Sequence, residues 1–452
     1  MKNQVDLLNG KILPSLTKLA LPIMATSLLQ MAYNMVDMIW IGRIGSGAVA
    51  AVGAAGMYIW LSSGIVALAK VGGQIKVGHS LGSGQQKEAA GYAKTALQLG
   101  VVLGLVFGII CVLGAVPLIS FFRLNSREVI VEAEHYLRIT GGGVIFSFIT
   151  MILTGIMMAL GNSTTPFKVT FVGLVINIIL DPLCIFGIGI IPAMGVTGAA
   201  VATVAAQGVS TVLIVYAARK DKALFPQIKF GTGIEWNYLK EMLCISMPAA
   251  LQSIIFTGIS MVIARLIAGW GDTAVAVQKV GSQIESISWM TAEGFAASLG
   301  SFVAQNYGAG NKKRVKEGYK KAMMIITIWG IFSTLLLVFL PGPIFKIFIP
   351  EIEVLPAGVE YLRILGYSQL FMCVEITTAG AFSGMGKTIP SSIEGIPLTA
   401  MRIPLAAVLS TTALGLSGIW WSISISSMLK GCVLFIWFLI VMHKMDEKTS
   451  IE

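Results

Sequence analysis

The sequence predicts an all-α integral membrane protein built from two six-helix bundles. Of 452 residues, 56% are hydrophobic and only 12% are charged, whereas soluble domains carry roughly 25% charged residues. The apolar residues form twelve stretches of bilayer-spanning length, six in each half of the chain. Because six is an even number, both halves have the same orientation, and a pseudo-two-fold axis along the membrane normal should relate them.

The twelve stretches are expected to be helices, because lipid cannot hydrogen bond to exposed backbone groups. A transmembrane β-barrel would show short alternating segments, and these runs are continuous. The first stretch lacks the small-residue cleavage site of a signal peptide, so we expect it to remain as a span. The predicted spans are 16–41, 48–75, 92–116, 136–160, 167–191, 194–217, 243–268, 277–306, 319–340, 361–385, 391–414 and 416–441.

The second half of the chain repeats short motifs of the first. Pro22 recurs as Pro248, and Gly82-Ser83-Gly84 recurs as Gly308-Ala309-Gly310, each 226 residues later. In a very apolar chain, two similar halves are typical of a transporter whose substrate path lies at the seam. Each matching proline removes one helix hydrogen bond. The resulting kinks are expected to be structural, and they are also candidate bending points for a conformational change.

The repeat defines the expected domains. We predict an N-terminal six-helix lobe over residues 1–217, a cytoplasmic linker over 218–242 and a C-terminal six-helix lobe over 243–452. Two bundles that face each other would leave a central cleft between them.

The net charge of +10 is explained by membrane topology. When the first three residues of each span are counted with the loop before it, the termini and the loops after even-numbered spans hold 21 of the 32 Lys and Arg residues, the opposite side holds seven, and the interiors of the spans hold four. By the positive-inside rule, both termini of this multi-pass protein should be cytoplasmic. We expect the chain to lie in the plasma membrane. We therefore expect no nucleic-acid partner; the expected partners are small organic substrates and membrane lipid, and the chain is expected to be a monomer.

Three features argue against other functions. The five cysteines lie scattered in apolar spans without a Cys-x-x-Cys pair, so neither a disulfide framework nor a metal site is expected. Residues 381–388 fit a loose P-loop pattern but end a span instead of following a strand. The three histidines are scattered near span ends, so we expect no enzyme and no cofactor.

Acidic residues inside spans are candidate functional groups, because an ionised group in the bilayer costs several kcal/mol. Asp37 lies late in the first span, and Asn177 and Asp181, four residues apart, share one helix face of the fifth. Pro182 should free a backbone carbonyl beside them, and Thr203 in the sixth span can add a hydroxyl. These oxygens suit a hard cation or a proton; the alternative is a purely structural polar network.

The second half has a possible second acidic locus. Glu285 in the eighth span and Glu375 in the tenth are candidates for contact with substrate or cation. Polar neighbours add to this set: Asn34, Gln252 and Gln283. For the remaining intramembrane charges, structural pairing is the expected role: Lys70, Glu293, Glu394, Arg402 and Lys430.

Several motifs together resemble the MATE (multidrug and toxic compound extrusion) family. They are Tyr33–Asp37, Gly42–Gly45, Ala304–Asn311 and Gly384–Thr388, and the resemblance covers nearly the whole chain. It implies twelve helices in two lobes that form a V, and efflux coupled to inward Na⁺ or H⁺.

Within the family, the chain looks most like the DinF-type branch. That resemblance implies a cation site at the positions that match here, Asp37, Asn177, Asp181 and Thr203. The NorM-type branch places an acid on the seventh helix, where this chain has Gln252 and no acid.

We therefore expect a secondary active antiporter that exports organic, cationic or amphipathic compounds in exchange for H⁺ or Na⁺ by alternating access. The alternative is a flippase for a lipid-linked sugar or another amphipathic lipid, which should show a more cationic cavity. A channel fits less well, because duplication and kinked helices favour alternating access.

The proposed coupling residues lie where the repeat fails. At the local offsets, Asp37 aligns with Ile263 and Asp181 with Ile403, so the second half lacks both carboxylates. The residues that the halves share are mainly glycine, proline and other small residues. The repeat thus describes the scaffold and not the site.

Overall fold

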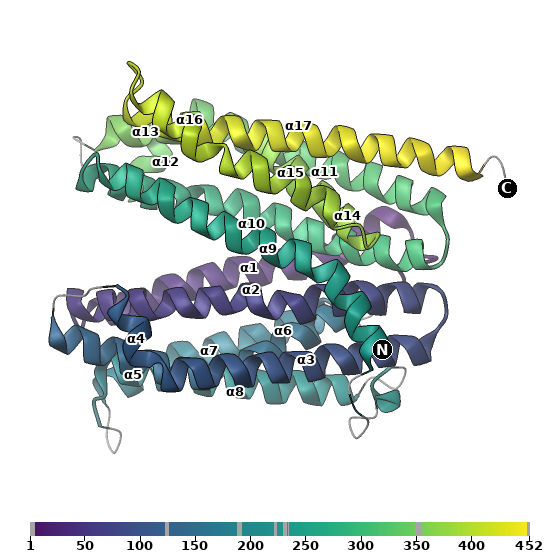
Figure 1. The fold of residues 1–452 in the computed structure, drawn as a ribbon, viewed down its shortest axis with the longest axis horizontal. Coiled ribbons are helices and arrows are strands. Elements are labelled where there is room, and N and C mark those ends of the chain that lie inside the picture. The colour runs from purple at the N-terminus through teal and green to yellow at the C-terminus, as the bar shows by residue number, and fades with distance from the viewer. Residues whose placement is uncertain are drawn as a thin grey trace. The chain divides into compact units, whose positions relative to one another are not determined.

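The structure is a computed structural model that describes residues 5–122, 126–187, 192–220, 224–228, 233, 235–348 and 354–449. Within these residues the regular secondary structure is helical (Figure 1). The elements are α1 (Ile12–Gly42), α2 (Ser46–Gly82), α3 (Gln86–Leu113), α4 (Ala115–Ser120), α5 (Arg127–Gly142), α6 (Val144–Ala159), α7 (Thr164–Phe186), α8 (Gly195–Arg219), η1 (Phe225–Gln227), α9 (Trp236–Ala268), α10 (Asp272–Gly308), α11 (Lys312–Phe339), α12 (Pro341–Phe348), α13 (Leu355–Gly366), α14 (Gln369–Gly384), α15 (Ile389–Ala400), α16 (Arg402–Ser410) and α17 (Leu416–Thr449).

The predicted spans coincide with single helices or with consecutive helix pairs. Nine helical segments of the described residues are long and apolar enough to cross a membrane, and α5 with α6, bent by 43°, can form a tenth. The predicted spans 277–306 and 361–385 coincide with α10 and with the pair α13 and α14, which are more polar. Residues 188–191, at the end of the predicted fifth span, lie outside the described residues.

The chain divides into two compact units. Unit 1 contains Leu21–Met247 and the residues before Leu7, and unit 2 contains Leu7–Ala20 and the residues from Pro248 onward. This division differs from the predicted lobes at two repeat-related helices. The initial segment of α1 belongs to unit 2, and the initial segment of α9 belongs to unit 1. The division falls within α1 beside Pro22 and within α9 beside Pro248, both of which lie inside their helices.

Specific contacts explain why these initial segments are exchanged. The Ser246 hydroxyl on α9 donates a hydrogen bond to the carbonyl of Leu68 on α2 at 2.7 Å. A side chain at Gly72 would bring its Cβ to 2.5 Å from the carbonyl oxygen of Met242, so only glycine allows α9 to lie this close to α2. In unit 2, the Ser298 hydroxyl on α10 donates to the carbonyl of Leu16 on α1 at 2.9 Å.

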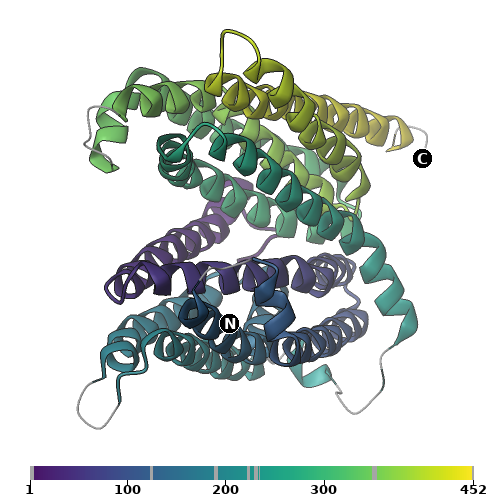
Figure 2. The same cartoon turned by 60° about the vertical axis from the view of Figure 1, so that its left-hand side comes forward.

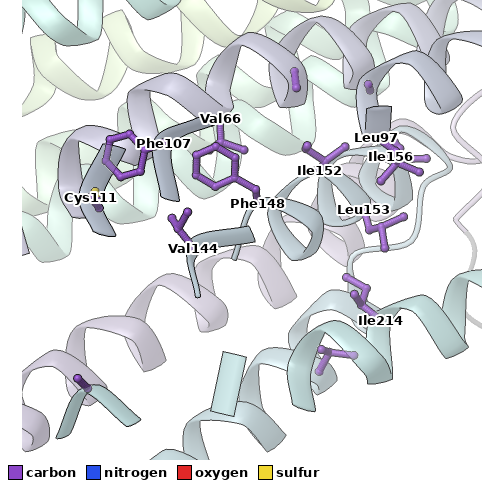
Figure 3. Close-up of a cluster of buried hydrophobic side chains, with 14 of the residues drawn as sticks. Val66, Leu97, Phe107, Cys111, Val144, Phe148, Ile152, Leu153, Ile156 and Ile214 are labelled. Atoms are coloured by element: carbon purple, nitrogen blue, oxygen red, sulfur yellow. The ribbon is translucent and has the colours of Figure 1, made fainter. Parts of the chain in front are cut away.

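The core of unit 1 is formed by apolar side chains of α2, α3, α6 and α8, which run side by side in both views of the fold (Figures 1 and 2). Phe107 on α3 and Phe148 on α6 belong to this cluster (Figure 3). A Cβ at Gly100 would lie 2.0 Å from Cδ1 of Ile152. Small residues at such crossings allow the membrane helices to approach closely.

Unit 2 packs around α10, α11, α14 and α17. A Cβ at Gly380 on α14 would lie 2.5 Å from the carbonyl oxygen of Ala296 on α10, so the two helix backbones are in contact. The aromatic rings of Tyr319 on α11 and Phe438 on α17 pack against each other in a tilted arrangement, with centroids 4.1 Å apart.

Candidate functional site

A pair of carboxyl groups lies inside unit 1, where α1 and α7 bring Asp37 and Asp181 together. The two side chains are close enough to hydrogen bond to each other. Asp181 is completely buried and Asp37 is half-buried. Two carboxyl groups can share a hydrogen bond only if one of them carries a proton, because a carboxylate has no donor.

The spacing on α7 places an amide beside this pair. Asn177 lies one turn before Asp181, and its Nδ2 donates a hydrogen bond to Asp181 Oδ1 at 3.2 Å. The helix continues through Pro182 and ends at Phe186, before Gly187 with a φ of 73°. The predicted arrangement of Asn177 and Asp181 on one face of the fifth span is therefore present.

Three oxygens of this cluster are buried without a hydrogen-bond partner in the described part of the chain. They are Asp37 Oδ1, Asn177 Oδ1 and Asp181 Oδ2. A buried polar atom without a partner costs about 1–3 kcal/mol, and more when the group is charged. The cluster therefore presents oxygen ligands of the kind that bind a proton or a hard cation.

Thr203 on α8 completes the predicted set through a tyrosine. Its side chain is half-buried and lies within reach of the side chain of Tyr33, which lies one turn before Asp37 on α1. The position of α8 is fixed by Gly198, because a Cβ there would lie 2.2 Å from the carbonyl oxygen of Cys184 on α7. All four predicted coupling residues thus belong to one region of unit 1.

Two tyrosines of this candidate site were not among the residues predicted from the sequence. Tyr33 interacts electrostatically with both Asp37 and Asp181, and its spacing of four residues from Asp37 was the available signal. Tyr136 on α5 is buried and also faces both aspartates. In the sequence it stands out only as part of a repeated motif.

The second predicted locus consists of separate contacts in unit 2. Glu285 on α10 accepts hydrogen bonds from the Tyr361 hydroxyl at 3.0 Å and from Gln369 Nε2 at 3.1 Å. Glu375 on α14 accepts a 2.7 Å hydrogen bond from the ammonium group of Lys430 on α17. The expected pairing of Lys430 with an acid is therefore present.

The amides of the second locus have different environments. Gln252 on α9 is half-buried, and its Oε1 accepts a hydrogen bond from the Ser392 hydroxyl at 3.3 Å. Gln283 on α10 is exposed, as is Asn34 on α1 in unit 1.

The repeat places a tyrosine beside an acid in both units. Tyr136 and Tyr361 occupy matching positions of the repeated motif Tyr-Leu-Arg-Ile. Tyr136 faces Asp37 and Asp181, and the Tyr361 hydroxyl donates to Glu285. The tyrosine occupies the same repeat position in both halves, whereas the acids beside it come from different positions of the repeat.

These features define a multi-pass membrane transporter with a buried carboxylate site, and comparison with known proteins gives its family. The MatE family model matches residues 22–183 and again residues 248–408, once in each half of the repeat. The chain belongs to the MatE family. By this family assignment it is a transporter and not an enzyme.

Relatives and a solved structure extend over almost the whole chain. "Probable multidrug resistance protein NorM" of Thermotoga maritima is 28% identical and covers 91% of this chain and 88% of its own length. "Multidrug export protein MepA" of Staphylococcus haemolyticus is 23% identical and covers 92% and 91%. A crystal structure of MATE in the bent conformation superposes with a TM-score of 0.90 at 24% identity, covering 99% of both chains. The last comparison shows the twelve-helix fold.

Proposed function

We propose that this protein is a secondary active antiporter that exports organic, cationic or amphipathic compounds in exchange for H⁺ or Na⁺. The observation that supports this most directly is the contact between Asp37 and Asp181 inside a membrane-spanning unit. Two ionised carboxylates in contact repel each other, and taking them out of water is costly. A bound proton or cation removes that cost, so its arrival and departure can drive a change of conformation.

The substrate class follows from the relatives, whose names describe multidrug resistance and multidrug export. We propose that the protein acts as a monomer in the plasma membrane with both termini in the cytoplasm. The set of Asp37, Asn177, Asp181 and Thr203 supports placement in the DinF-like branch. The flippase alternative is not favoured, because the names of these two relatives describe multidrug resistance and multidrug export.

In the proposed mechanism, the pair of Asp37 and Asp181 changes its arrangement when an ion binds or leaves. With a proton or Na⁺ bound, Asp37 on α1 and Asp181 on α7 are held together. After the ion leaves, their repulsion favours separation of the two helices. Tyr33 links Thr203 on α8 to the same side of α1, so α8 is coupled to this change. Alternating access follows if the two arrangements expose substrate to opposite sides of the membrane.

The test is efflux of a cationic dye from proteoliposomes under an imposed H⁺ gradient or an imposed Na⁺ gradient. The active gradient identifies the coupling ion. The Asp37→Asn and Asp181→Asn variants should each reduce gradient-driven efflux to the level of protein-free liposomes, because the amide neither ionises nor binds a proton.

A matched control is Glu128→Gln, the same carboxyl-to-amide change at an exposed position in the first turn of α5. It should transport at the normal rate. Full transport by both aspartate variants would refute the coupling assignment. A gradient-dependent movement of lipid in place of dye would support the flippase.

A further inference from the structure

Unit 2 buries a group of ionisable side chains that the proposed coupling site does not use. The most buried are Glu394 on α15 with 4% exposure, Lys430 with 6%, Arg402 on α16 with 8% and Glu375 with 8%. Glu285 is half-buried nearby on α10 and interacts electrostatically with Arg402. The group thus combines three carboxyl groups with two permanently or normally cationic side chains.

Four members of this group have defined partners. Lys430 is paired with Glu375, and Glu285 accepts hydrogen bonds from Tyr361 and Gln369. The Arg402 guanidinium donates through Nε to the hydroxyl of Ser426 at 3.1 Å and through a terminal nitrogen to the hydroxyl of Ser427 at 3.0 Å.

Glu394 is the exception. Both of its carboxyl oxygens are buried, and neither has a hydrogen-bond partner in the described part of the chain. Helix α15 packs on α14, α16 and α17. The ionisable groups that face Glu394 from these helices are Glu375 and Lys430, with which it interacts electrostatically. Arg402 is the buried charge of α16 and interacts electrostatically with Glu375.

The side of α15 that faces α9 offers no ionised partner to Glu394. A Cβ at Gly395 would lie 2.3 Å from Nε2 of Gln252, so α9 approaches closely at this level with an amide. The basic residue of α9 in unit 2, Arg265, is exposed in the last turn of the helix.

The charges of this group do not balance when every member is ionised. Three carboxylates and two cations leave one negative charge in excess. An uncompensated charge buried in a membrane protein costs several kcal/mol. One bound proton removes the excess, and the carboxyl group without any donor is the one whose ionised form the surroundings stabilise least.

We propose that Glu394 binds one proton, in a site of unit 2 that is separate from the carboxylate pair of unit 1. When the proton passes from the Glu394 carboxyl to water, the ammonium group of Lys430 bridges Glu375 and Glu394. An ammonium group has three N–H donors and can contact both carboxylates at once. When the proton returns, Lys430 pairs again with Glu375 alone.

Infrared difference spectroscopy of the purified full-length protein in lipid nanodiscs tests this site without any transport. The C=O stretching band of a protonated carboxyl group is followed as the pH is changed. The background is the Asp37→Asn, Asp181→Asn double variant, which removes the carboxyl groups of unit 1. A result here is therefore independent of whether those aspartates couple transport.

In this background, adding Glu394→Gln should remove one carboxyl band that titrates, and Glu394→Asp should retain a shifted band. Glu360→Gln, the same change at an exposed position of α13 outside this group, is the matched control and should leave the Glu394 band in place. Lys430→Met should add a band, because Glu375 then loses its cation and binds a proton.

The proposal fails if the band persists in Glu394→Gln, or if it is lost in Glu360→Gln as well. Elution as a single folded species in size-exclusion chromatography confirms that each variant is comparable. If Glu394→Gln does not fold, a band that keeps its position in Glu394→Asp contradicts the assignment.

Discussion

At the scale of single residues, close backbone contact explains how the site of unit 1 is held. Asp181 and Thr203 come from consecutive helices, and the glycine at position 198 allows α7 and α8 to touch near both of them. In lipid, such contacts stabilise helix pairs by packing, because there is little hydrophobic gain in bringing apolar helices together. The geometry of the proposed coupling residues thus depends on an uncharged neighbour.

The Gly198→Ala variant should be less stable than the parent protein. The added Cβ would lie 2.2 Å from the carbonyl oxygen of Cys184, a backbone atom that cannot move aside. Overpacking of this kind typically costs about 1–3 kcal/mol, so the apparent melting temperature in detergent should fall. Gradient-driven efflux should fall as well, since α7 and α8 are forced apart beside Asp181.

Gly208→Ala on the same helix is the control. A Cβ at Gly208 meets no atom within 4 Å, and alanine is the better helix former by about 1 kcal/mol. This variant should melt at or slightly above the temperature of the parent. Equal melting temperatures for both variants would mean that α7 and α8 do not depend on the contact.

The residues of the site were partly predictable from the sequence. Asn177 and Asp181 were found because their spacing of four residues places them on one helix face. Tyr136 was missed, because its position beside Asp37 and Asp181 results from the packing of α5 against other helices. The isolation of Glu394 was also not predictable, since the partners of a buried carboxyl depend on neighbouring helices.

At the scale of elements, hydropathy predicted where the spans lie but not where they break. The apolar run over 136–160 continues through the 43° bend between α5 and α6. The bend coincides with three consecutive glycines, and Cβ atoms at Gly141 and Gly143 would lie 2.3 Å from Cys111 Cβ and 2.5 Å from a Val204 methyl carbon. The break therefore arises from close packing against α3 and α8, which hydropathy does not register.

The initial segment of α9 is attached to unit 1 by a polar cluster. The Lys76 ammonium on α2 contacts the Glu241 carboxylate, and the Tyr92 hydroxyl donates to the same carboxylate at 2.6 Å. Lys94 on α3 forms a second ion pair, 3.0 Å from Glu235, just before α9 begins. Ion pairs of this kind contribute little stability individually. Together, these contacts hold the initial segment of α9 against the helices of unit 1.

Linking Lys76 to Glu241 with a carbodiimide, which joins contacting amine and carboxyl groups directly, should leave gradient-driven efflux unchanged. Both residues belong to unit 1, so the amide adds no constraint on movement between units. Mass spectrometry of the digested protein measures the cross-linked fraction. The Lys76→Arg, Lys94→Arg double variant keeps both charges but does not form the amide, and it reports any effect of the reagent on other carboxyl groups.

If efflux is lost in proportion to this cross-link, and the double variant remains active under the same treatment, the initial segment of α9 must move relative to α2 during transport. That outcome would place the boundary between moving parts before Met247 and not beside Pro248.

At the scale of the whole molecule, duplication supplied a scaffold and divergence supplied different chemistry to each unit. Unit 1 holds two aspartates in contact, whereas unit 2 holds three glutamates with Lys430 and Arg402. The sequence predicted the two halves, because short motifs repeat at a nearly constant offset. It did not predict that initial segments are exchanged between the units, because the exchange depends on contacts such as that of Ser246 with the carbonyl of Leu68.

The distribution of basic residues predicts the orientation of this scaffold, and cysteine labelling measures it. Lys313, in the first turn of α11, and Thr412, between α16 and α17, are both exposed and fall on opposite sides of the membrane by the count of spans. The side of Lys313 carries 21 basic residues and the side of Thr412 carries seven, so the side of Lys313 should be cytoplasmic.

A membrane-impermeant maleimide should therefore label Thr412→Cys in intact cells and Lys313→Cys only after permeabilisation. The parent chain measures the background from its own five cysteines. Labelling in the reverse order would invert the topology and would place both termini outside the cytoplasm.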